Sequence, residues 1–201
     1  MTRLILLTFR KRTSFFMNKE FRTVLSHPRF ELTIDRLCHQ LLENHQDFSN
    51  TCLISIQWRG TLFAERIYQR LAELTDLSNV KKGKLDVTFY RDDFRKGKAP
   101  LIPHPNEMDF LIEDKDVVLI DDVLYTGRTI SAALTALQHY GRPKSIELLA
   151  LVDRRFNRHL PIQPDYVGLT IDSLDEAHIK VEWAEVHGED KILLYSRKED
   201  I

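Results

Sequence analysis

The stretch VVLIDDVLYTGRT, Val117–Thr129, decides how this chain folds. Its first four residues form a continuous apolar run, typical of a strand that is buried on both faces of a sheet. Two aspartates and a turn follow, and a helical pattern then runs over Thr129–Tyr140 until Gly141 and Pro143 end it. A buried strand that leads through a polar turn into a helix predicts one unit of an α/β fold with a largely parallel sheet.

The residues before this stretch predict a second unit of the same kind. Apolar residues spaced as on one helix face occupy Leu32–Leu42, and the short apolar, β-branched run Thr51–Ile56 predicts a strand. Arg59 and Gly60 break that strand before a helix predicted over Thr61–Glu73. The alternation of strands and helices therefore continues toward the N-terminus.

Further strands are predicted at Leu85–Tyr90 and Ile146–Val152, and weak alternation over Val181–Tyr195 predicts strands at an edge of the sheet. The charged, proline-containing segment Arg91–Asp109 indicates a long loop or flap. Ligands of such folds lie beyond the carboxyl ends of the strands. The loops at 58–60, 121–129 and 153–161 are therefore predicted to share one rim.

Composition fits a single globular unit. The chain has 201 residues, of which 43% are hydrophobic and 29% charged, enough for one sizeable core. A formal net charge of -1 excludes the global basic field that drives nonspecific nucleic-acid binding. Cys38 and Cys52 have no metal or disulfide spacing, which predicts buried thiols in a reducing cytoplasm.

The N-terminal segment is predicted to lie outside the fold. The apolar run Leu4–Phe9 is shorter than a signal-peptide core or a membrane span, and the basic cluster of residues 10–12 follows the run instead of preceding it. We expect residues 1–17 to be a disordered extension, or Met17 to be the true first residue, and residues 18–201 to form the domain. No membrane partner is expected.

Asp121, Asp122 and the turn after them suit one ligand. Two carboxylates at the end of a buried strand can accept hydrogen bonds from the vicinal hydroxyls of a ribose. A phosphate can be held by the backbone N–H groups of Tyr125–Thr129, the hydroxyls of Thr126 and Thr129 and the helix dipole. Gly127 has no side chain, so it lets the backbone approach the phosphate closely. Either feature alone is common in solvated turns, whereas their joint order predicts a ribose 5-phosphate site.

The segment IDDVLYTGRT resembles the PRPP-binding signature of type I phosphoribosyltransferases. Five further segments are similar, in order, to the pyrimidine operon regulator family with uracil phosphoribosyltransferase activity, and the resemblance covers roughly residues 21–197. They are YRDD at 90–93, GRP at 141–143, LVDR at 151–154, LPI at 160–162 and DYVG at 165–168. The resemblance implies a mainly parallel central sheet flanked by helices, with a small hood and a flap.

The resemblance also implies roles for particular residues. Asp121 and Asp122 would hold the ribose of PRPP, Tyr125–Thr129 (with Thr126, Gly127 and Arg128) its 5-phosphate, and Arg59 with Gly60 its pyrophosphate. The family's flap and the segment beside the base match two further groups of residues: Tyr90, Arg91, Asp92 and Asp93 in the flap, and Val152, Asp153 and Arg154 beside the base. If the segment at 121–129 did not resemble a PRPP site, Arg59 and the flap residues would be interpreted as surface groups. Asp153–Arg154 has a simple salt-bridged turn as its alternative interpretation.

The reaction implied by the resemblance is displacement of pyrophosphate from C1 of PRPP by uracil, giving UMP in the cytoplasm. Asp121, Asp122 and Arg59 would be the catalytic residues, because carboxylates stabilise positive charge on the ribose ring and arginine stabilises the leaving group. Mg²⁺ would be held mainly by PRPP and water, with no direct protein ligand assigned. A homodimer or higher homo-oligomer is implied by analogy.

Several positions differ from the family. Asp35 and Asn44 stand where the RNA-binding form has threonine and arginine, and Leu169 stands where it has lysine, which disfavours RNA binding by the family's mode. Arg155 replaces a glycine in the longer hood segment DRRFNRHLPI, and its basic residues form an alternative basic patch or a solvated loop. Two alternatives therefore stay open: a phosphoribosyltransferase for another base, and an RNA-binding or nucleotide-sensing regulator with little catalysis.

Overall fold

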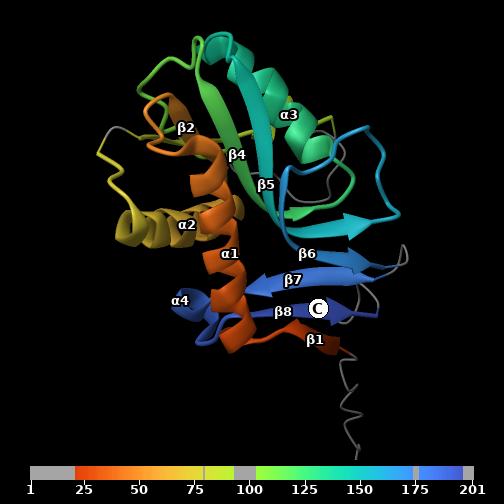
Figure 1. Cartoon of the computed structure of the whole chain (residues 1–201). Helices are drawn as coiled ribbons and strands as arrows, with labels where there is room; N and C mark the ends of the chain where they lie inside the picture. Colours follow the sequence, from red (N-terminus) through yellow and green to blue (C-terminus); the bar gives the residue numbers. More distant parts are fainter. Residues whose placement is uncertain (1–20, 79, 93–102, 174–176, 197–201) are drawn as a thin grey trace, which may run out of the picture.

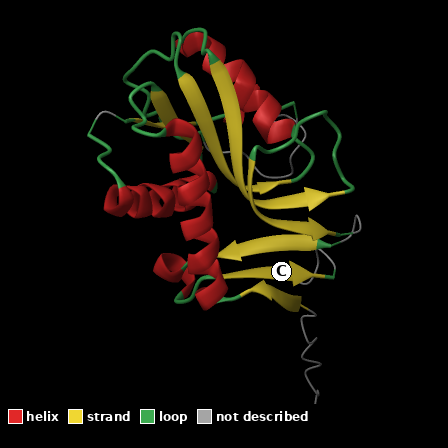
Figure 2. Cartoon of the chain, viewed as in Figure 1, coloured by secondary structure: helices red, strands yellow, loops and turns green. Residues whose placement is uncertain are grey.

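The computed structural model describes residues 21–78, 80–92, 103–173 and 177–196 of the chain. Two sheets and four α-helices organise these residues, with the larger sheet above the smaller one in the view of Figures 1 and 2. The expectation for residues 1–17 falls outside the described part of the chain.

A five-stranded sheet forms the centre of the molecule. Its order is β3-β2-β4-β5-β6, and each neighbouring pair is parallel. The α/β class and the mainly parallel sheet are thereby confirmed. The strands are β2 (Thr51–Ile56), β3 (Lys81–Leu85), β4 (Asp116–Leu124), β5 (Ser145–Arg155) and β6 (Tyr166–Asp172).

Helices cover both faces of this sheet, and alternate residues of its central strand supply the two cores. From β4, Val118 and Ile120 pack into the core that includes helices α1 (His27–His45) and α2 (Gly60–Leu74). Val117 and Leu119 belong to the second core, with helix α3 (Arg128–Leu137). Burial on both faces explains the continuous apolar run of this strand.

The smaller sheet, here called the hood sheet, is antiparallel and has the order β1-β8-β7. Its strands are β1 (Phe21–Leu25), β7 (His178–Glu182) and β8 (Lys191–Tyr195), with the short helix α4 (Ala184–His187) between the last two. The tail was predicted to extend the edge of the main sheet, and that prediction is wrong. β7 and β8 pair instead with β1, a strand that was not predicted.

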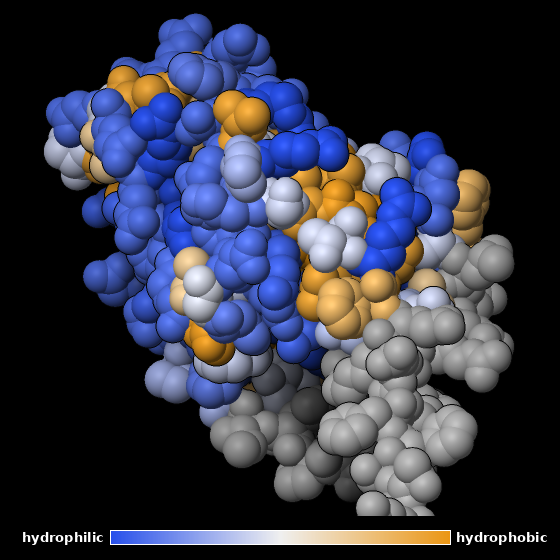
Figure 3. All heavy atoms as spheres, turned by 90° about the horizontal axis from the view of Figure 1, so that it is seen from below, coloured by the Kyte–Doolittle hydropathy of each residue, from blue (hydrophilic) through white to orange (hydrophobic). Residues whose placement is uncertain are grey.

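Aromatic packing holds the hood sheet against the main body. The ring of Trp183, which precedes α4, meets Phe30 of α1 edge to face at a centroid distance of 5.3 Å. Seen from the side of the hood sheet, the described surface is largely hydrophilic, and apolar residues gather in one area (Figure 3). The buried apolar residues of the hood sheet therefore belong to the same core as those of α1 and α2.

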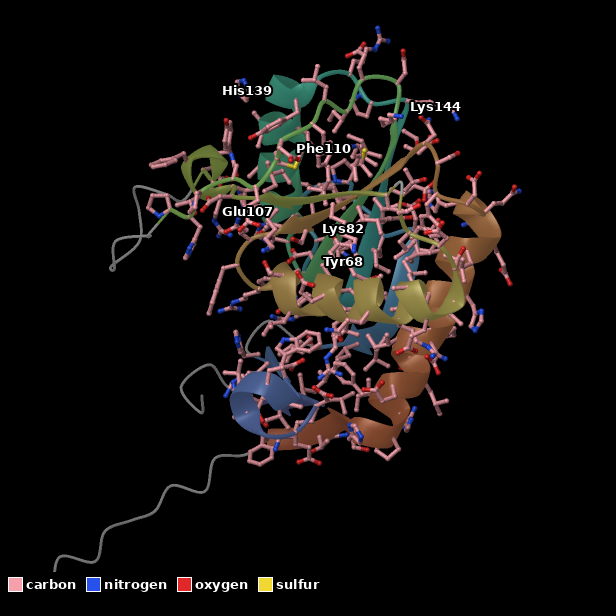
Figure 4. All side chains as sticks on the ribbon, turned by 90° about the vertical axis from the view of Figure 1, so that its left-hand side faces the viewer. Tyr68, Lys82, Glu107, Phe110, His139 and Lys144 are labelled. Atoms are coloured by element: carbon pink, nitrogen blue, oxygen red, sulfur yellow. The ribbon has the colours of Figure 1, made fainter. Side chains whose placement is uncertain are left out.

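The strand predicted at Leu85–Tyr90 is also wrong, because the strand lies earlier, at Lys81–Leu85, and Thr88–Tyr90 is a 3-10 helix. Asp86 ends the strand by accepting the backbone N–H of Thr88 at 2.6 Å. Lysines hid the strand from a hydrophobicity pattern, and charged side chains are common on edge strands. Figure 4 views this edge, where Lys82 Nζ lies 4.8 Å from the ring centroid of Tyr68.

Other elements differ from the predictions mainly in extent. β4 continues past the apolar run to Leu124, so both aspartates lie inside the strand and not in the turn. Helix α1 is longer than its apolar stripe, and β6 was not predicted. Cys38 and Cys52 are buried free thiols, as expected. Within the described ranges, no helix combines the length and apolar character needed to cross a membrane.

Candidate active site

A pocket of about 820 Å³ opens at the carboxyl end of the five-stranded sheet. This is the location expected for a ligand of an open parallel sheet, and the volume is ample for a nucleotide-sized ligand. The three loops predicted to share one rim all contribute to its wall, and so does the start of β7. Its lining includes Trp58, Arg59, Asp86, Thr88, Arg91, His104, residues 121–130, Arg154 and residues 177–179.

Asp121 and Asp122 lie at the floor of this pocket, only 6% and 8% exposed. The hydrogen-bonded pairing of β4 with β5 fixes their position, since Asp121 is in register with Ala150. One carboxylate oxygen, Asp121 Oδ1, accepts the backbone N–H of Asp122 at 3.0 Å. Both carboxylates are therefore held by the central strand and not by a mobile turn.

The electrostatics of the pair favour a ligand that brings donors or positive charge. Burial raises the pKa of Asp121 well above its usual range, and the neighbouring charge of Asp122 raises it further. The pKa of Asp122 is also raised by burial. The positive charge of Arg59 partly offsets this effect, because it favours the ionised form and so acts to lower the pKa of both groups. Hydroxyl donors or a cation would stabilise the ionised pair.

The loop predicted to hold a phosphate, residues 125–129 and here called the phosphate loop, joins β4 to the first turn of α3. Gly127 has φ +88°, a left-handed conformation that disfavours residues with a side chain. An added Cβ there would also lie 3.3 Å from Ile162 Cδ1. The carbonyl of Thr126 accepts the backbone N–H of His159 at 3.0 Å, so the hood segment supports the loop. The helix N-terminus thus faces the pocket with N–H groups that suit an anion.

A second loop, at Gln57–Gly60, enters the pocket from the end of β2. An added Cβ at Gly60 would meet the backbone oxygen of Ile120 at 2.6 Å, so only glycine lets α2 begin this close to β4. Arg59 lines the pocket beside the two aspartates. Trp58 is 72% exposed and its ring stacks on that of His104, with centroids 6.2 Å apart. The Gln57–Trp58 peptide bond is cis.

The residues assigned to the flap lie beside the phosphate loop. Arg91 Nη1 donates to Thr129 Oγ1 at 3.1 Å, and Asp92 forms an ion pair with Arg128. The ring of Tyr90 lies 5.7 Å from that of His139, at the far end of α3. Asp93 is outside the described residues.

The side predicted to bind the base is assembled from several segments. Arg154 is 4% exposed, lines the pocket, donates from Nε to Ser173 Oγ at 2.7 Å and lies over the ring of Tyr125, 4.1 Å from its centroid. The side chain of Val152 is buried in the core instead. Asp153 pairs with Arg158, which also donates to the carbonyl of Tyr125, so a salt-bridged turn does form, with a different arginine from the one expected.

Sequence reasoning missed several pocket residues, among them Asp86, Thr88, His104 and His178. The first three follow β3, whose position was predicted incorrectly. His178 begins β7, far along the chain from the rest of the site. A correct placement of β3 would have directed attention to Asp86, because Asp86 follows that strand at the same end of the sheet.

The positions predicted to disfavour RNA binding make contacts within the protein. Asp35 of α1 forms an ion pair with Arg70 at 2.5 Å, and Asn44 Nδ2 donates to Tyr166 Oη at 2.8 Å. Leu169 of β6 packs against the core. In the alternative basic patch, Arg155 pairs with Asp172 at 2.7 Å. These side chains therefore serve contacts within the protein.

Comparison with known proteins gives a consistent result. The phosphoribosyl transferase domain family matches residues 21–185. The bifunctional protein PyrR of Deinococcus radiodurans is 39% identical over 173 residues, which cover 86% of this chain and 93% of that relative. The bifunctional protein pyrR of Enterococcus faecalis strain OG1RF is 41% identical over 161 residues, covering 80% and 89%.

Solved structures share the fold at lower identity. The hypoxanthine phosphoribosyltransferase of Trypanosoma cruzi superposes with a TM-score of 0.66 at 15% identity, covering 88% of this chain and 96% of that one. That of Staphylococcus aureus gives 0.65 at 21% identity, covering 90% and 94%. These similarities confirm the type I phosphoribosyltransferase fold.

Proposed function

The chain belongs to the phosphoribosyl transferase domain family and, within it, to the PyrR proteins, and from this membership we propose that it makes UMP and pyrophosphate from uracil and PRPP. The observation that carries the proposal is the continuous arrangement of two buried carboxylates and a helix N-terminus at 121–129. A ribose bound at Asp121 and Asp122 would have its 5-phosphate a few residues further on, at the phosphate loop.

The proposed reaction is a displacement at C1 of the ribose. A ring nitrogen of uracil forms the bond to C1, the bond from C1 to pyrophosphate breaks, and pyrophosphate leaves with the electron pair while the uracil nitrogen gives up its proton. Positive charge spreads over the ribose ring in the transition state. The ionised forms of Asp121 and Asp122 would stabilise that charge, and Arg59 would stabilise the leaving pyrophosphate.

Magnesium fits the same residues. Carboxylate oxygens are hard ligands suited to Mg²⁺, which retains much of its hydration shell. Burial raises the pKa of Asp121 and of Asp122, and a nearby cation would favour their ionised forms. The ion would be held mainly by PRPP and water, with these two carboxylates nearby. When bound, it would neutralise charge on the pyrophosphate.

We propose that Arg154 reads the base. A guanidinium can only donate hydrogen bonds, so it suits the carbonyl acceptors of a pyrimidine such as uracil. Its contacts with Tyr125 and Ser173 fix its orientation before a ligand arrives. Purine bases with a ring carbonyl satisfy the same donor, which is why the base must be determined by experiment.

Binding of RNA is a second candidate, prompted by the resemblance to pyrimidine operon regulators. The ion pair of Asp35 with Arg70 and the engagement of Asn44 argue against the family's mode of binding, because an aspartate repels phosphates and each missing cation removes counterion release. A nucleotide-sensing regulator with little catalysis would keep the pocket and lose the turnover. The first function is therefore the one to test.

Pyrophosphate release from PRPP and Mg²⁺ tests the proposal directly, with uracil, hypoxanthine, guanine and orotate supplied separately. We expect release with uracil to exceed release with each other base. Preference for a purine would replace uracil and keep the reaction class. Binding of PRPP without release for any base would overturn the catalytic proposal and favour the sensor.

A further inference from the structure

The flap residues Arg91 and Asp92 lie at the first turn of α3, and two side-chain contacts join the segments. Arg91 Nη1 donates to Thr129 Oγ1 at 3.1 Å, and Asp92 forms an ion pair with Arg128. Arg128 and Thr129 are the first two residues of α3. Two consecutive residues of one segment therefore contact two consecutive residues of the proposed phosphate site.

The residues that precede Arg91 are anchored at two points. The 3-10 helix η1 (Thr88–Tyr90) is fixed at its start by Asp86, which accepts the Thr88 N–H at 2.6 Å. At its end, the ring of Tyr90 lies 5.7 Å from that of His139, which Figure 4 labels beside α3. The guanidinium of Arg91 is consequently delivered to the phosphate loop by ordered structure.

Charge at the phosphate loop needs a further contributor. A phosphate monoester carries a charge of about -1.5 to -2 near neutral pH, whereas a helix N-terminus supplies about half a positive charge. Arg128 is the one basic residue of the loop sequence YTGRT, and its guanidinium is paired with Asp92. Arg91 lines the same pocket, and its positive charge acts to lower the pKa of Asp121, against the larger effect of burial. Its field thus reaches both the ribose and the phosphate subsites.

We propose that Arg91 is a ligand of the 5-phosphate of the substrate, and that Asp92 is a positioning residue that holds this segment on Arg128. The inference rests on the proposed function, because it assumes that the loop at 125–129 holds the phosphate. An arginine presents several N–H donors in one plane. Arg91 can therefore contact Thr129 and still donate charge-assisted hydrogen bonds to a phosphate.

Binding of ribose 5-phosphate, measured by titration calorimetry, tests the role of Arg91 without requiring turnover. Loss of charge-assisted bonds should weaken binding by Arg91→Gln about 10- to 100-fold. Arg91→Lys should retain part of the affinity, since it keeps the charge and loses the planar donors. Arg142→Gln is the matched control, because Arg142 is exposed near the amino end of β5, opposite the pocket.

Asp92 is tested by comparing ligands with and without the phosphate. Asp92→Asn should weaken ribose 5-phosphate and UMP by a smaller factor than Arg91→Gln and leave uridine unchanged, which a general loss of folding would not do. Equal affinity of Arg91→Gln and wild type for ribose 5-phosphate would overturn the inference even if uracil turnover is found. Failure of the wild type to bind ribose 5-phosphate or UMP would overturn it as well. Binding that depends on Arg91 in a protein without turnover would support it and refute only the proposed reaction.

Discussion

The two ends of the pocket are built in different ways. The end proposed to hold the ribose and the phosphate comes largely from one uninterrupted stretch, in which a central strand carries both aspartates and runs directly into the phosphate loop and α3. The end proposed to bind the base combines the end of β5 with the start of the hood sheet. Residues 121 and 129 lie close in sequence, whereas Arg154 and His178 are brought together only by the fold.

This difference indicates how reaction and specificity are divided. A contiguous strand, turn and helix brings the two aspartates and the loop together through local chain connectivity, so it can set the reaction class. A wall assembled from distant segments depends on how each of those segments is placed, so it can set the choice of base. We therefore expect substitutions at the first end to affect turnover with every base, and those at the second to affect the choice of base.

The largest effect is expected at the ribose end. Asp122→Asn removes a negative charge that would stabilise the positively charged ribose ring, and turnover should fall about 100-fold or more with any accepted base. The measurement is pyrophosphate release at saturating PRPP and base. Asp109→Asn, an exposed carboxylate outside the pocket lining, is the control and should behave as wild type. Turnover above a tenth of wild type would contradict the proposed role.

An intermediate effect is expected at the base end. Arg154→Met keeps much of the side-chain bulk and removes the donors, so the KM for uracil should rise about tenfold while the KM for PRPP stays within about twofold. Arg155→Met is the matched control, because Arg155 is exposed and paired with Asp172. A parallel rise in both KM values would show that Arg154 supports the whole pocket instead of reading the base.

A smaller effect concerns stability. Because burial raises the pKa of Asp121, the folded protein retains a proton that the unfolded chain has lost, and the free energy of unfolding falls as pH rises above the ordinary aspartate range. Asp121→Asn has no such group, so it should be more stable than wild type by about 1 kcal/mol at pH 7 without ligand. Urea unfolding at pH 7 and pH 4 is the measurement, and the difference should shrink at pH 4. A less stable variant at pH 7 would contradict the cause assigned to the pKa shift.

The same contrast governs what the sequence could predict. Buried parallel strands and the strand, turn and helix around residues 117–140 were predictable because their signals are local: an apolar run, a glycine in the turn and a helix start. β3 was misplaced because lysines on an edge strand obscure the apolar pattern. The hood sheet was not predicted because β1 and β8 pair across nearly the whole chain, and no local signal encodes that pairing. His104 and His178 reach the pocket only through such long-range arrangement.

The most direct test of the central claim is the dissociation constant for PRPP with Mg²⁺, measured by titration calorimetry in the absence of any base. If residues 121–129 form the PRPP site, wild type and Asp109→Asn should bind alike, and Asp122→Asn should bind at least about tenfold more weakly. Absence of PRPP binding by the wild type, or equal binding by Asp122→Asn, would contradict the assignment of this site.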